Sequence, residues 1–592
     1  MKSSVQAPER KSGEANWDVW GPLGLLAVVL WFARYFVAQK PFGLDDDTSV
    51  QWVQFGLAGV AVALLGWGYQ LAKEGTPGAR IVLRDRLLVV IGLCSFLGYF
   101  NFGHLHFGNF VHVWDTYHYV MGSKYFPELG YDKLYECAAV VDLESGRKDE
   151  LLRRTLTDLR NNLIIRPDEI IAHPERCKES FSPERWESFR RDINTFHGFV
   201  NEGRWKEIHQ DHGYNATPVW TLAGAALTNM GPVSMAQLTR LNLLDPLYLA
   251  LTLVMVWWAF GPRAFAVAAL TLGTNFSNRY YWTGGAFLRH DWVFYLVASI
   301  CLLKKDRPFL GGAAFAYATL LRLFPGLAAL GPVIAAVEYY RTHHTLDRRF
   351  VRWVAGGAVG TALLVGASFV AFGGVTTWER FAQNTVKHSN TPLTNHMGLR
   401  TLLSWRPNTI GQRMQDNTQI DAWAKWKATR LEKWHQALPV FWALMGLAVW
   451  LVWLAVKASG PDPSFALALG IGFIVFGAEL TNYYYCFLMG IAVLHAQRRE
   501  VGIILGALAM LTLFINWGPL QWMSHWLDEQ YVAMSLASIF AVVGIWLLFT
   551  KWGQEAAFLP DPAPALAGGL VPPPAAAKEE GEKKKRKGKK RR

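Results

Sequence analysis

One aspartate in an aromatic stretch has surroundings that suit acid–base chemistry. Asp115 follows an apolar segment and is flanked by Trp114, Tyr117, His118 and Tyr119. A carboxylate at an apolar boundary has a raised pKa, which makes it a competent proton acceptor. The aromatic neighbours can stack against a sugar ring. The alternative is a structural aspartate that caps a helix, since Asp-Thr-Tyr-His can begin one.

An arginine inside an apolar segment is the second candidate. Arg322 stands shortly before Pro325, in a segment of small and apolar residues. Arginine within a membrane span costs about 2.5–3.5 kcal/mol, so it has a partner or lines a polar cavity. Such a guanidinium can bind a phosphate through paired hydrogen bonds. The alternative is a side chain that extends to the lipid headgroups.

Two further groups of polar residues fall in connecting segments. Arg289, His290 and Asp291 form a short charged turn, which can hold a donor headgroup or be an ion-paired rim. His388 and Asn395 lie in a longer polar segment, where a histidine can neutralise a departing phosphate or simply be exposed.

Metal and nucleotide chemistry receive less support. His104, His106, His112 and His118 are spaced by two, six and six residues, which does not define one helical face for zinc. Asp45–Asp47 imitates a metal-binding DxD motif but reads as a solvated turn. The chain has no GxGxxG or GxxxxGK[ST] motif, so ATP-driven work is not expected.

The elements that must position these residues are membrane helices. Of 592 residues, 52% are hydrophobic and the mean hydropathy is +0.13, which is too apolar for an ordinary soluble protein. Apolar runs of about 15–22 residues recur, about the length that crosses a bilayer. They predict an all-α polytopic membrane protein with about fourteen transmembrane helices, at 17–38, 51–72, 87–107, 241–260, 264–280, 289–303, 309–323, 325–340, 352–372, 437–457, 464–480, 482–495, 501–518 and 531–551.

Basic residues in the short loops set the orientation. One alternating topology, with both termini in the cytoplasm, places all of these loops on the cytoplasmic side of an inner or plasma membrane. The basic residues are Lys73, Arg80, Arg84, Arg86, Arg263, Lys304, Lys305, Arg307, Arg341, Arg348, Arg349, Arg352, Lys457, Arg498, Arg499 and Lys551. The chain then divides into a cytoplasmic tail (1–16), helices 1–3 (17–107), a first large outer domain (108–240), helices 4–9 (241–372), a second outer loop (373–436), helices 10–14 (437–551) and a Pro/Ala linker with a basic tail (552–592).

The two ends of the chain and the cysteines add little chemistry. No cleavage site follows the first apolar run, so we expect a retained anchor. The last fifteen residues hold ten Lys/Arg and three Glu, a net charge of +7. This tail favours anionic lipid headgroups over nucleic acid. Cys137 and Cys177 both fall in the first outer domain, where they can pair or remain buried thiols.

A run of motifs resembles GT-C glycosyltransferases, most closely the polyprenol-phosphate-dependent mannosyltransferases of a family 87-like branch. The motifs occur in the family's order over most of 87–500. They are Asp115-x-x-x-Tyr119 with its aromatic run, Tyr214-x-x-x-Pro218, GGAAFAYATLLRLFPGLAAL ending near Arg322, Asn395 with GLRTLL, and Asn482-Tyr483-Tyr-Tyr. The chain departs from the family where Arg322 replaces a lysine, where Leu288–Asp291 replaces Gln-Asn or an acidic pair, and where extra N-terminal helices precede Asp115.

The resemblance implies a function on the non-cytoplasmic face. Asp115 would be the general base of an inverting hexosyl (mannose-like) transfer from a polyprenyl-phosphate donor to a lipid or glycan acceptor. The substrate-binding residues would be Tyr117, His118, Arg289, His290, Asp291, Arg322, His388, Asn395, Asn482 and Tyr483. No cofactor is expected, because the activated sugar arrives on a lipid. One alternative is a transporter or flippase of lipid-linked saccharides, in which paired charges at mid-membrane depth are expected. The other is a non-catalytic scaffold.

Overall fold

The computed structural model describes residues 46–73, 78–517 and 527–555. The predicted tail 1–16, the predicted span 17–38, Asp45 and the basic end of the chain lie outside these residues. The protein is mostly helical, with 76% helix and two small two-stranded sheets among the described residues. This confirms the all-α class.

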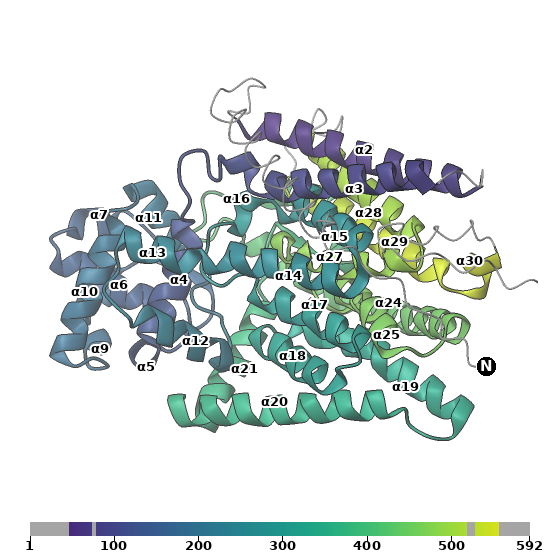
Figure 1. Cartoon of the computed structure of the whole chain (residues 1–592). Helices are drawn as coiled ribbons and strands as arrows, with labels where there is room; N and C mark the ends of the chain where they lie inside the picture. Colours follow the sequence, from purple (N-terminus) through teal and green to yellow (C-terminus); the bar gives the residue numbers. More distant parts are fainter. Residues whose placement is uncertain (1–45, 74–77, 518–526, 556–592) are drawn as a thin grey trace, which may run out of the picture.

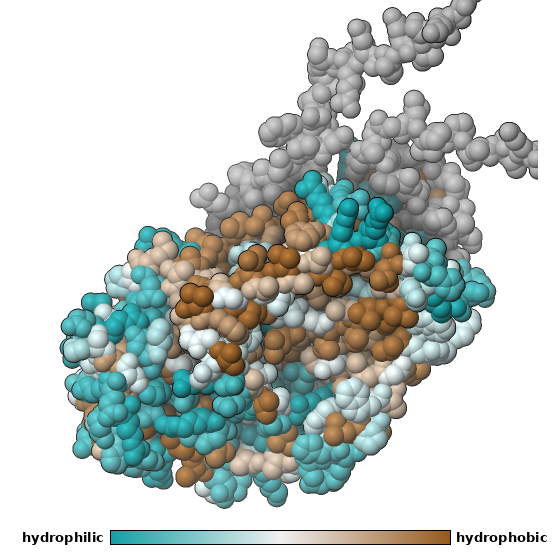
Figure 2. Space-filling view, turned by 90° about the horizontal axis from the view of Figure 1, so that it is seen from below, coloured by the Kyte–Doolittle hydropathy of each residue, from teal (hydrophilic) through white to brown (hydrophobic). Residues whose placement is uncertain are grey.

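Six helices in the described part of the chain are long and apolar enough to cross a membrane. They cover Asp47–Leu71, Met235–Phe260, Arg348–Phe372, Ala424–Ser459, Glu500–Trp517 and Glu529–Leu548. Figure 2 shows a hydrophobic band between two hydrophilic ends. The protein is therefore a membrane protein by helix length and composition, while the count of about fourteen crossings remains a prediction.

Within the described residues, helices occupy the predicted spans, but most of them begin and end at other residues than predicted. The bundle consists of α2 (Asp47–Lys73), α3 (Gly78–Tyr99), α14 (Leu244–Phe260), α15 (Pro262–Thr274), α17 (Asp291–Lys304), α18 (Pro308–Leu321), α19 (Leu330–His343), α20 (Arg348–Phe372), α24 (Ala424–Ser459), α25 (Pro463–Gly470), α26 (Gly472–Gly477), α27 (Leu488–Ile491), α28 (Glu500–Trp517) and α29 (Glu529–Leu548), with short α30 (Lys551–Glu555) after it. The 3-10 helices η3 (Phe324–Ala329), η4 (Asn482–Phe487) and η5 (Ala492–Ala496) interrupt it. The predicted span 87–107 is wrong at its end, because the backbone turns to positive φ at Asn101 and Phe102.

Glycines let two of these helices approach closely. A Cβ on Gly312 of α18 would lie 1.8 Å from the carbonyl oxygen of Trp353 in α20. A Cβ on Gly356 of α20 would lie 1.9 Å from the carbonyl oxygen of Phe309. Small residues of this kind permit backbone-to-backbone packing in membranes. Val351, Val354 and other residues on the remaining face of α20 are exposed, as a lipid-facing helix requires.

The first outer domain is a separate helical unit at one end of the molecule (Figure 1). It contains α4 (Val113–Lys124), α5 (Phe126–Leu129), α6 (Leu134–Glu144), α7 (Lys148–Leu152), α8 (Asp168–Ala172), α9 (Glu175–Lys178), α10 (Pro183–His197), α11 (Glu202–His209), α12 (Pro218–Thr228) and α13 (Met235–Asn242). Strands β1 (Leu156–Asp158) and β2 (Leu163–Ile165) form an antiparallel hairpin in it.

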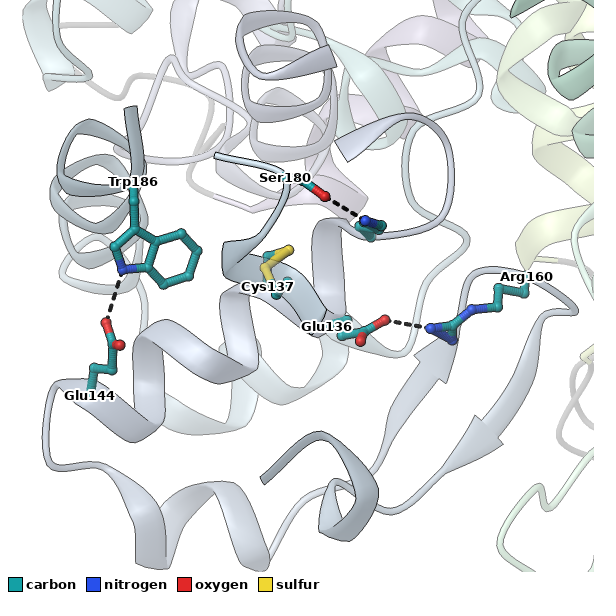
Figure 3. Close-up of a disulfide and its surroundings, with 8 residues drawn as sticks. Glu136, Cys137, Glu144, Arg160, Ser180 and Trp186 are labelled. Atoms are coloured by element: carbon teal, nitrogen blue, oxygen red, sulfur yellow. Dashed lines mark hydrogen bonds and ion pairs between the residues drawn. A yellow bond between two sulfur atoms is a disulfide. The ribbon is translucent and has the colours of Figure 1, made fainter. Parts of the chain in front are cut away.

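A disulfide joins two helices of this domain. Cys137 of α6 bonds to Cys177 of α9, with a Cα–Cα distance of 5.5 Å (Figure 3). The surrounding contacts between Glu136 and Arg160, and between Glu144 and Trp186, tie α6 to the hairpin and to α10. The structure thus resolves the pairing that the sequence left open.

Several of the basic turns meet at the end opposite this domain. Arg349, in the first turn of α20, lies 2.9 Å from Asp462 in the turn before α25. Arg498 donates to the carbonyl oxygens of Leu548 and Gly553, next to α30. Figure 1 places the α19–α20 turn and α30 at this end. The grouping agrees with the positive loops being on one side.

The second outer segment lies between the bundle and the outer domain. It contains α21 (Val375–Ser389), β3 (His396–Met397), α22 (Leu399–Ser404) and α23 (Gly411–Met414), and β3 pairs with β4 (Leu480–Thr481). Helix α24 begins at Ala424, so the predicted start of that span at 437 is wrong. Helix α12 packs on α4, α18 and α20.

Candidate active site

A cavity of about 470 Å³ lies where the outer domain, the second outer segment and the bundle meet. Side chains from α4, α21, α24, η4 and the end of α18 line it. Six predicted site residues are among them: Asp115, His118, Arg289, Arg322, His388 and Tyr483. The volume lies within the range of small-molecule sites, about 300–1,000 Å³. Residues widely separated in the sequence therefore meet around a single hollow.

Helix α4 presents Asp115 to this cavity. The helix begins at Val113, and the Nδ1 atom of His112 accepts the backbone N–H of Asp115 at 3.2 Å, so His112 is the cap. Burial lowers the pKa of His112 to about 3, which keeps the ring neutral as an acceptor. Asp115 is therefore not the capping residue of the alternative interpretation. Asp115, His118 and Tyr119 share one helical face, and all three line the cavity.

The Asp115 carboxyl is buried beside a cation. Its side chain is 14% exposed, and its Oδ2 lies 2.9 Å from Nε of Arg289. The pair is close enough for an ion pair, although neither atom has hydrogen-bond geometry to any described residue. Burial raises the pKa of Asp115, and Arg289 opposes part of that rise. The result is a carboxylate with more proton affinity than an exposed aspartate.

A buried aspartate holds the turn that carries Arg289. The Oδ1 atom of Asp245 accepts the backbone N–H groups of Arg289 and His290, both at 2.7 Å. Its Oδ2 atom lies 2.6 Å from Nδ1 of His290. The Oδ1 atom of Asp291, the first residue of α17, accepts the backbone N–H of Trp292 at 2.8 Å. His290 and Asp291 are not among the residues that line the cavity, and substrate contact by them remains a prediction.

Arg322 is a buried cation without a full set of partners. It lies between α18 and η3 and is 7% exposed. Its Nη1 donates to the carbonyl oxygen of Leu321 at 3.3 Å, while Nε and Nη2 have no hydrogen-bond partner among the described residues. The guanidinium faces the rings of Tyr119 at 5.3 Å and Trp220 at 6.0 Å. Unfilled donors on a buried guanidinium suit an incoming anion.

Tyr119 stands between the two arginines. The Arg289 guanidinium lies 4.5 Å from its ring centre, and the Arg322 guanidinium contacts the same ring. Tyr483 and Tyr484 face Arg289 at 5.2 and 5.6 Å. Aromatic faces stabilise desolvated cations by about 0.5–2 kcal/mol each. The tyrosines thus hold two positive charges in one low-dielectric pocket.

Asn395 and Asn482 connect the second outer segment to the bundle. The backbone N–H of Asn482 donates to the carbonyl oxygen of Asn395 at 3.0 Å, and Nδ2 of Asn395 donates to Oδ1 of Asn482 at 3.1 Å. Asn482 also donates to the carbonyl oxygen of Ser277 at 2.7 Å. Neither asparagine lines the cavity, but their neighbours Thr481 and Tyr483 do. They join the second outer segment to the bundle, and substrate contact by them remains a prediction.

Tyr117 lies away from the cavity. Its side chain is fully buried in the outer domain, and its hydroxyl is 3.1 Å from Nε2 of His209. Tyr117 follows Asp115 by two positions, which places it on a different face of α4. The predicted contact between Tyr117 and a sugar therefore has no support from the structure.

His388 faces the cavity as a neutral ring. Burial lowers its pKa to about 3, with neighbouring His212 and Lys387 adding to the effect. Its Nε2 has no hydrogen-bond partner among the described residues. A neutral imidazole can donate or accept a hydrogen bond, and neutralisation of a departing phosphate by His388 remains a prediction.

Several cavity residues were not predicted. Asp211 accepts from Trp114 at 2.6 Å, and Glu479 lies 3.2 Å from Arg400 and accepts from Thr401 at 2.9 Å. Glu479 stands at the end of an apolar run, and Asp211 precedes the Tyr214–Pro218 motif. These two sequence positions were the features from which Glu479 and Asp211 could have been predicted as cavity residues. The further lining residues are Tyr119, His212, His396, Arg400 and Trp434.

The structure does not bring the described residues of the histidine run, or those of the Asp45–Asp47 segment, together as a set of metal ligands. His106 contacts the carbonyl oxygen of Gly284, and His118 lies 2.6 Å from the Tyr135 hydroxyl. Asp46 accepts the N–H of Ser49 and Asp47 pairs with Arg279, so both have local structural roles. Among residues 46–73, 78–517 and 527–555, no cluster of three or more His, Cys, Asp or Glu could hold a metal ion.

No family model, curated protein or solved structure matches the chain.

Proposed function

We propose that this protein is a membrane glycosyltransferase that moves a hexosyl group from a polyprenyl-phosphate donor to a hydroxyl acceptor. The observation that carries the proposal is the pairing of a proton acceptor and an anion site in one cavity. Asp115 has a raised pKa, and Arg322 has unfilled hydrogen-bond donors. The proposed topology is GT-C-like, with about fourteen spans, both termini in the cytoplasm and the cavity on the opposite face.

The rest of the cavity lining suits a lipid-borne substrate. Leu321, Leu323, Phe324, Phe381, Trp434 and Phe441 contribute apolar surface to it. Trp434 and Phe441 belong to α24, one of the long apolar helices, and Leu323 is 46% exposed. An amphipathic hollow of this kind accepts a phosphate at its charged side and an isoprenoid chain along its apolar side.

The proposed reaction is a single inverting displacement. Asp115 takes the proton from the acceptor hydroxyl, whose oxygen forms a bond to the anomeric carbon. The bond from that carbon to the phosphate oxygen breaks, and its electron pair leaves with polyprenyl phosphate. Arg322 stabilises the charge on the departing phosphate, which is a large catalytic contribution in a water-poor site. Arg289 orients the Asp115 carboxylate until the acceptor arrives.

The direct test is sugar transfer by the purified full-length chain. The donors are radiolabelled polyprenyl-phosphate hexoses, and wild type is compared with Asp115→Asn. We expect transfer by wild type and a loss of about 10²–10⁴-fold in the variant. Retained activity in Asp115→Asn would remove that residue as the base. Donor movement across a vesicle membrane without transfer would point to a flippase instead.

A further inference from the structure

A second hollow lies next to the candidate active site. Its volume is about 770 Å³, larger than that of the active-site cavity. One wall is the segment Phe126–Lys133 of the outer domain, with Leu159 and Arg160 from the hairpin beside it. The opposite wall is α21 together with the end of α20. This outer groove therefore lies between the outer domain and the second outer segment.

Helix α21 separates the outer groove from the active-site cavity. Phe381, Thr385 and His388 line the cavity, whereas Arg380, Gln383 and Lys387 line the outer groove. Both sets follow helical spacing, so the two hollows lie against neighbouring faces of one helix. The residue that lines both hollows on α21 is Asn384.

Asn384 is a polar side chain with unused capacity. It is 5% exposed, and its Oδ1 has no hydrogen-bond partner among the described residues. Its Nδ2 reaches the carbonyl oxygen of Tyr214 only at 3.5 Å. An unmet buried acceptor costs about 1–3 kcal/mol unless a ligand or water satisfies it. Its position favours a ligand with hydroxyl donors at the junction of the two hollows.

The groove presents both charge signs and aromatic surface. The side chains of Asp132, Arg380 and Gln383 form no hydrogen bond or ion pair within the part of the chain that the structure describes, while Asp132 interacts electrostatically with Arg160 and Lys387. The other charged residues are engaged: Glu128 with Arg185 at 2.6 Å, and Arg160 with Glu136 at 2.6 Å. Free donors and acceptors together suit neutral hydroxyls better than a polyanion.

Aromatic rings form an apolar part of the groove. Phe126 lies 5.2 Å from both Tyr131 and Phe372, measured between ring centres, and all three line the groove. Phe126 and Tyr131 are 5% and 6% exposed, so half-buried Phe372 supplies most of the accessible ring surface. Pyranose and furanose rings expose C–H faces that pack on aromatic side chains. The scattered polar groups around a small aromatic surface favour a saccharide over a lipid chain.

We propose that the outer groove binds a soluble saccharide chain, whose terminal sugar passes Asn384 and offers its hydroxyl to Asp115. The proposal rests on the proposed transferase function and selects a glycan over a lipid as the acceptor. The groove holds the sugars behind the reacting one, so it sets acceptor affinity without touching the reacting atoms.

The test measures saccharide binding directly, which separates it from transfer. Full-length protein in nanodiscs is titrated with fluorescent tetrasaccharides of mannose, glucose, arabinofuranose and N-acetylglucosamine. The variants are Arg380→Ala and Gln383→Trp; the first removes a donor and the second fills the groove. The matched control is Glu379→Ala, since Glu379 is exposed on α21 but lines neither hollow. Asp115→Asn reports on binding without catalysis.

We expect at least one tetrasaccharide to bind wild type and Glu379→Ala equally, and both groove variants at least tenfold more weakly. The same tetrasaccharide should still bind Asp115→Asn, in which the groove is intact. Unchanged thermal unfolding of the variants shows that they fold. Absence of binding by all four saccharides, or equal binding by the groove variants, overturns the acceptor site. Saccharide binding without transfer from any polyprenyl-phosphate donor leaves the groove intact and removes the proposed function.

Discussion

The Oδ2 atom of Asp115 lies 2.9 Å from Nε of Arg289, and both side chains line the cavity that also contains Arg322. The two cations differ in what surrounds them. Both guanidiniums have hydrogen-bond donors without partners, but Arg289 is paired with a carboxylate, whereas Arg322 forms no ion pair with any described residue. This asymmetry separates a cation that orients the base from one that awaits an anion, and it gives each a distinct experimental signature.

The pH dependence of transfer should report on the Asp115–Arg289 pair. Burial raises the pKa of Asp115, and Arg289 lowers it in part. A general base works only when ionised, so kcat/KM should fall as the pH drops through that raised pKa. In Arg289→Gln the opposing cation is gone, and the acidic limb should move to higher pH. A limb that stays in place or moves to lower pH would contradict the assignment.

Replacing Arg322 should separate stability from ligand binding. Arg322→Met removes buried donors that have no partner, so the free energy of unfolding should rise by about 1–3 kcal/mol. Binding of polyprenyl phosphate should weaken at least tenfold, because the anion loses its cation. Thermal unfolding with and without the lipid measures both effects. Exposed Arg190→Met is the control, and a destabilised variant with normal lipid binding would count against the anion site.

The disulfide should stabilise the outer domain. Cys137 and Cys177 are separated by 40 residues, a loop whose closure is worth about 4 kcal/mol. Cys137→Ala/Cys177→Ala should expose α6–α9 to proteolysis and hydrogen exchange while leaving the bundle protected. Reductant should do the same to wild type. Cys94→Ala, which removes a thiol outside the domain, should have no such effect.

The proposed topology can be tested by labelling. In a chain without Cys94, Cys301 and Cys486, single cysteines replace Glu187 in the outer domain and His344 in the α19–α20 turn. A membrane-impermeant thiol reagent applied to intact cells should label the first position only. His344→Cys should react after the membrane is opened. Labelling of both positions in intact cells would reject the orientation.

Local sequence spacing predicted the part of the site that lies on one helix. Asp115 and His118 were both selected, and the structure places both on the cavity. The same spacing contains the signal for Tyr119, four positions after Asp115, which was named only as an aromatic neighbour. It also explains why Tyr117 turns away into the outer domain.

The limits of the fold prediction also have physical causes. Long apolar runs predicted the helices because burial in lipid demands internally hydrogen-bonded backbone. Their ends were less predictable. Helix α24 extends outward to Ala424, since a polar, tryptophan-rich run can stay helical outside the membrane. Helix α3 ends early at Tyr99, before a backbone of positive φ values.

The sequence alone determined that this chain is a helical membrane protein with a candidate carboxylate and a candidate cation. Only the tertiary structure decided which charges meet. Arg289 reaches Asp115 because Asp245, from another helix, holds its turn, and Glu479 and Asp211 join the cavity from segments far along the chain. Hydrophobicity and helical periodicity are properties of residues that are close together in the sequence. A cavity is made by packing between distant elements, which local patterns do not encode.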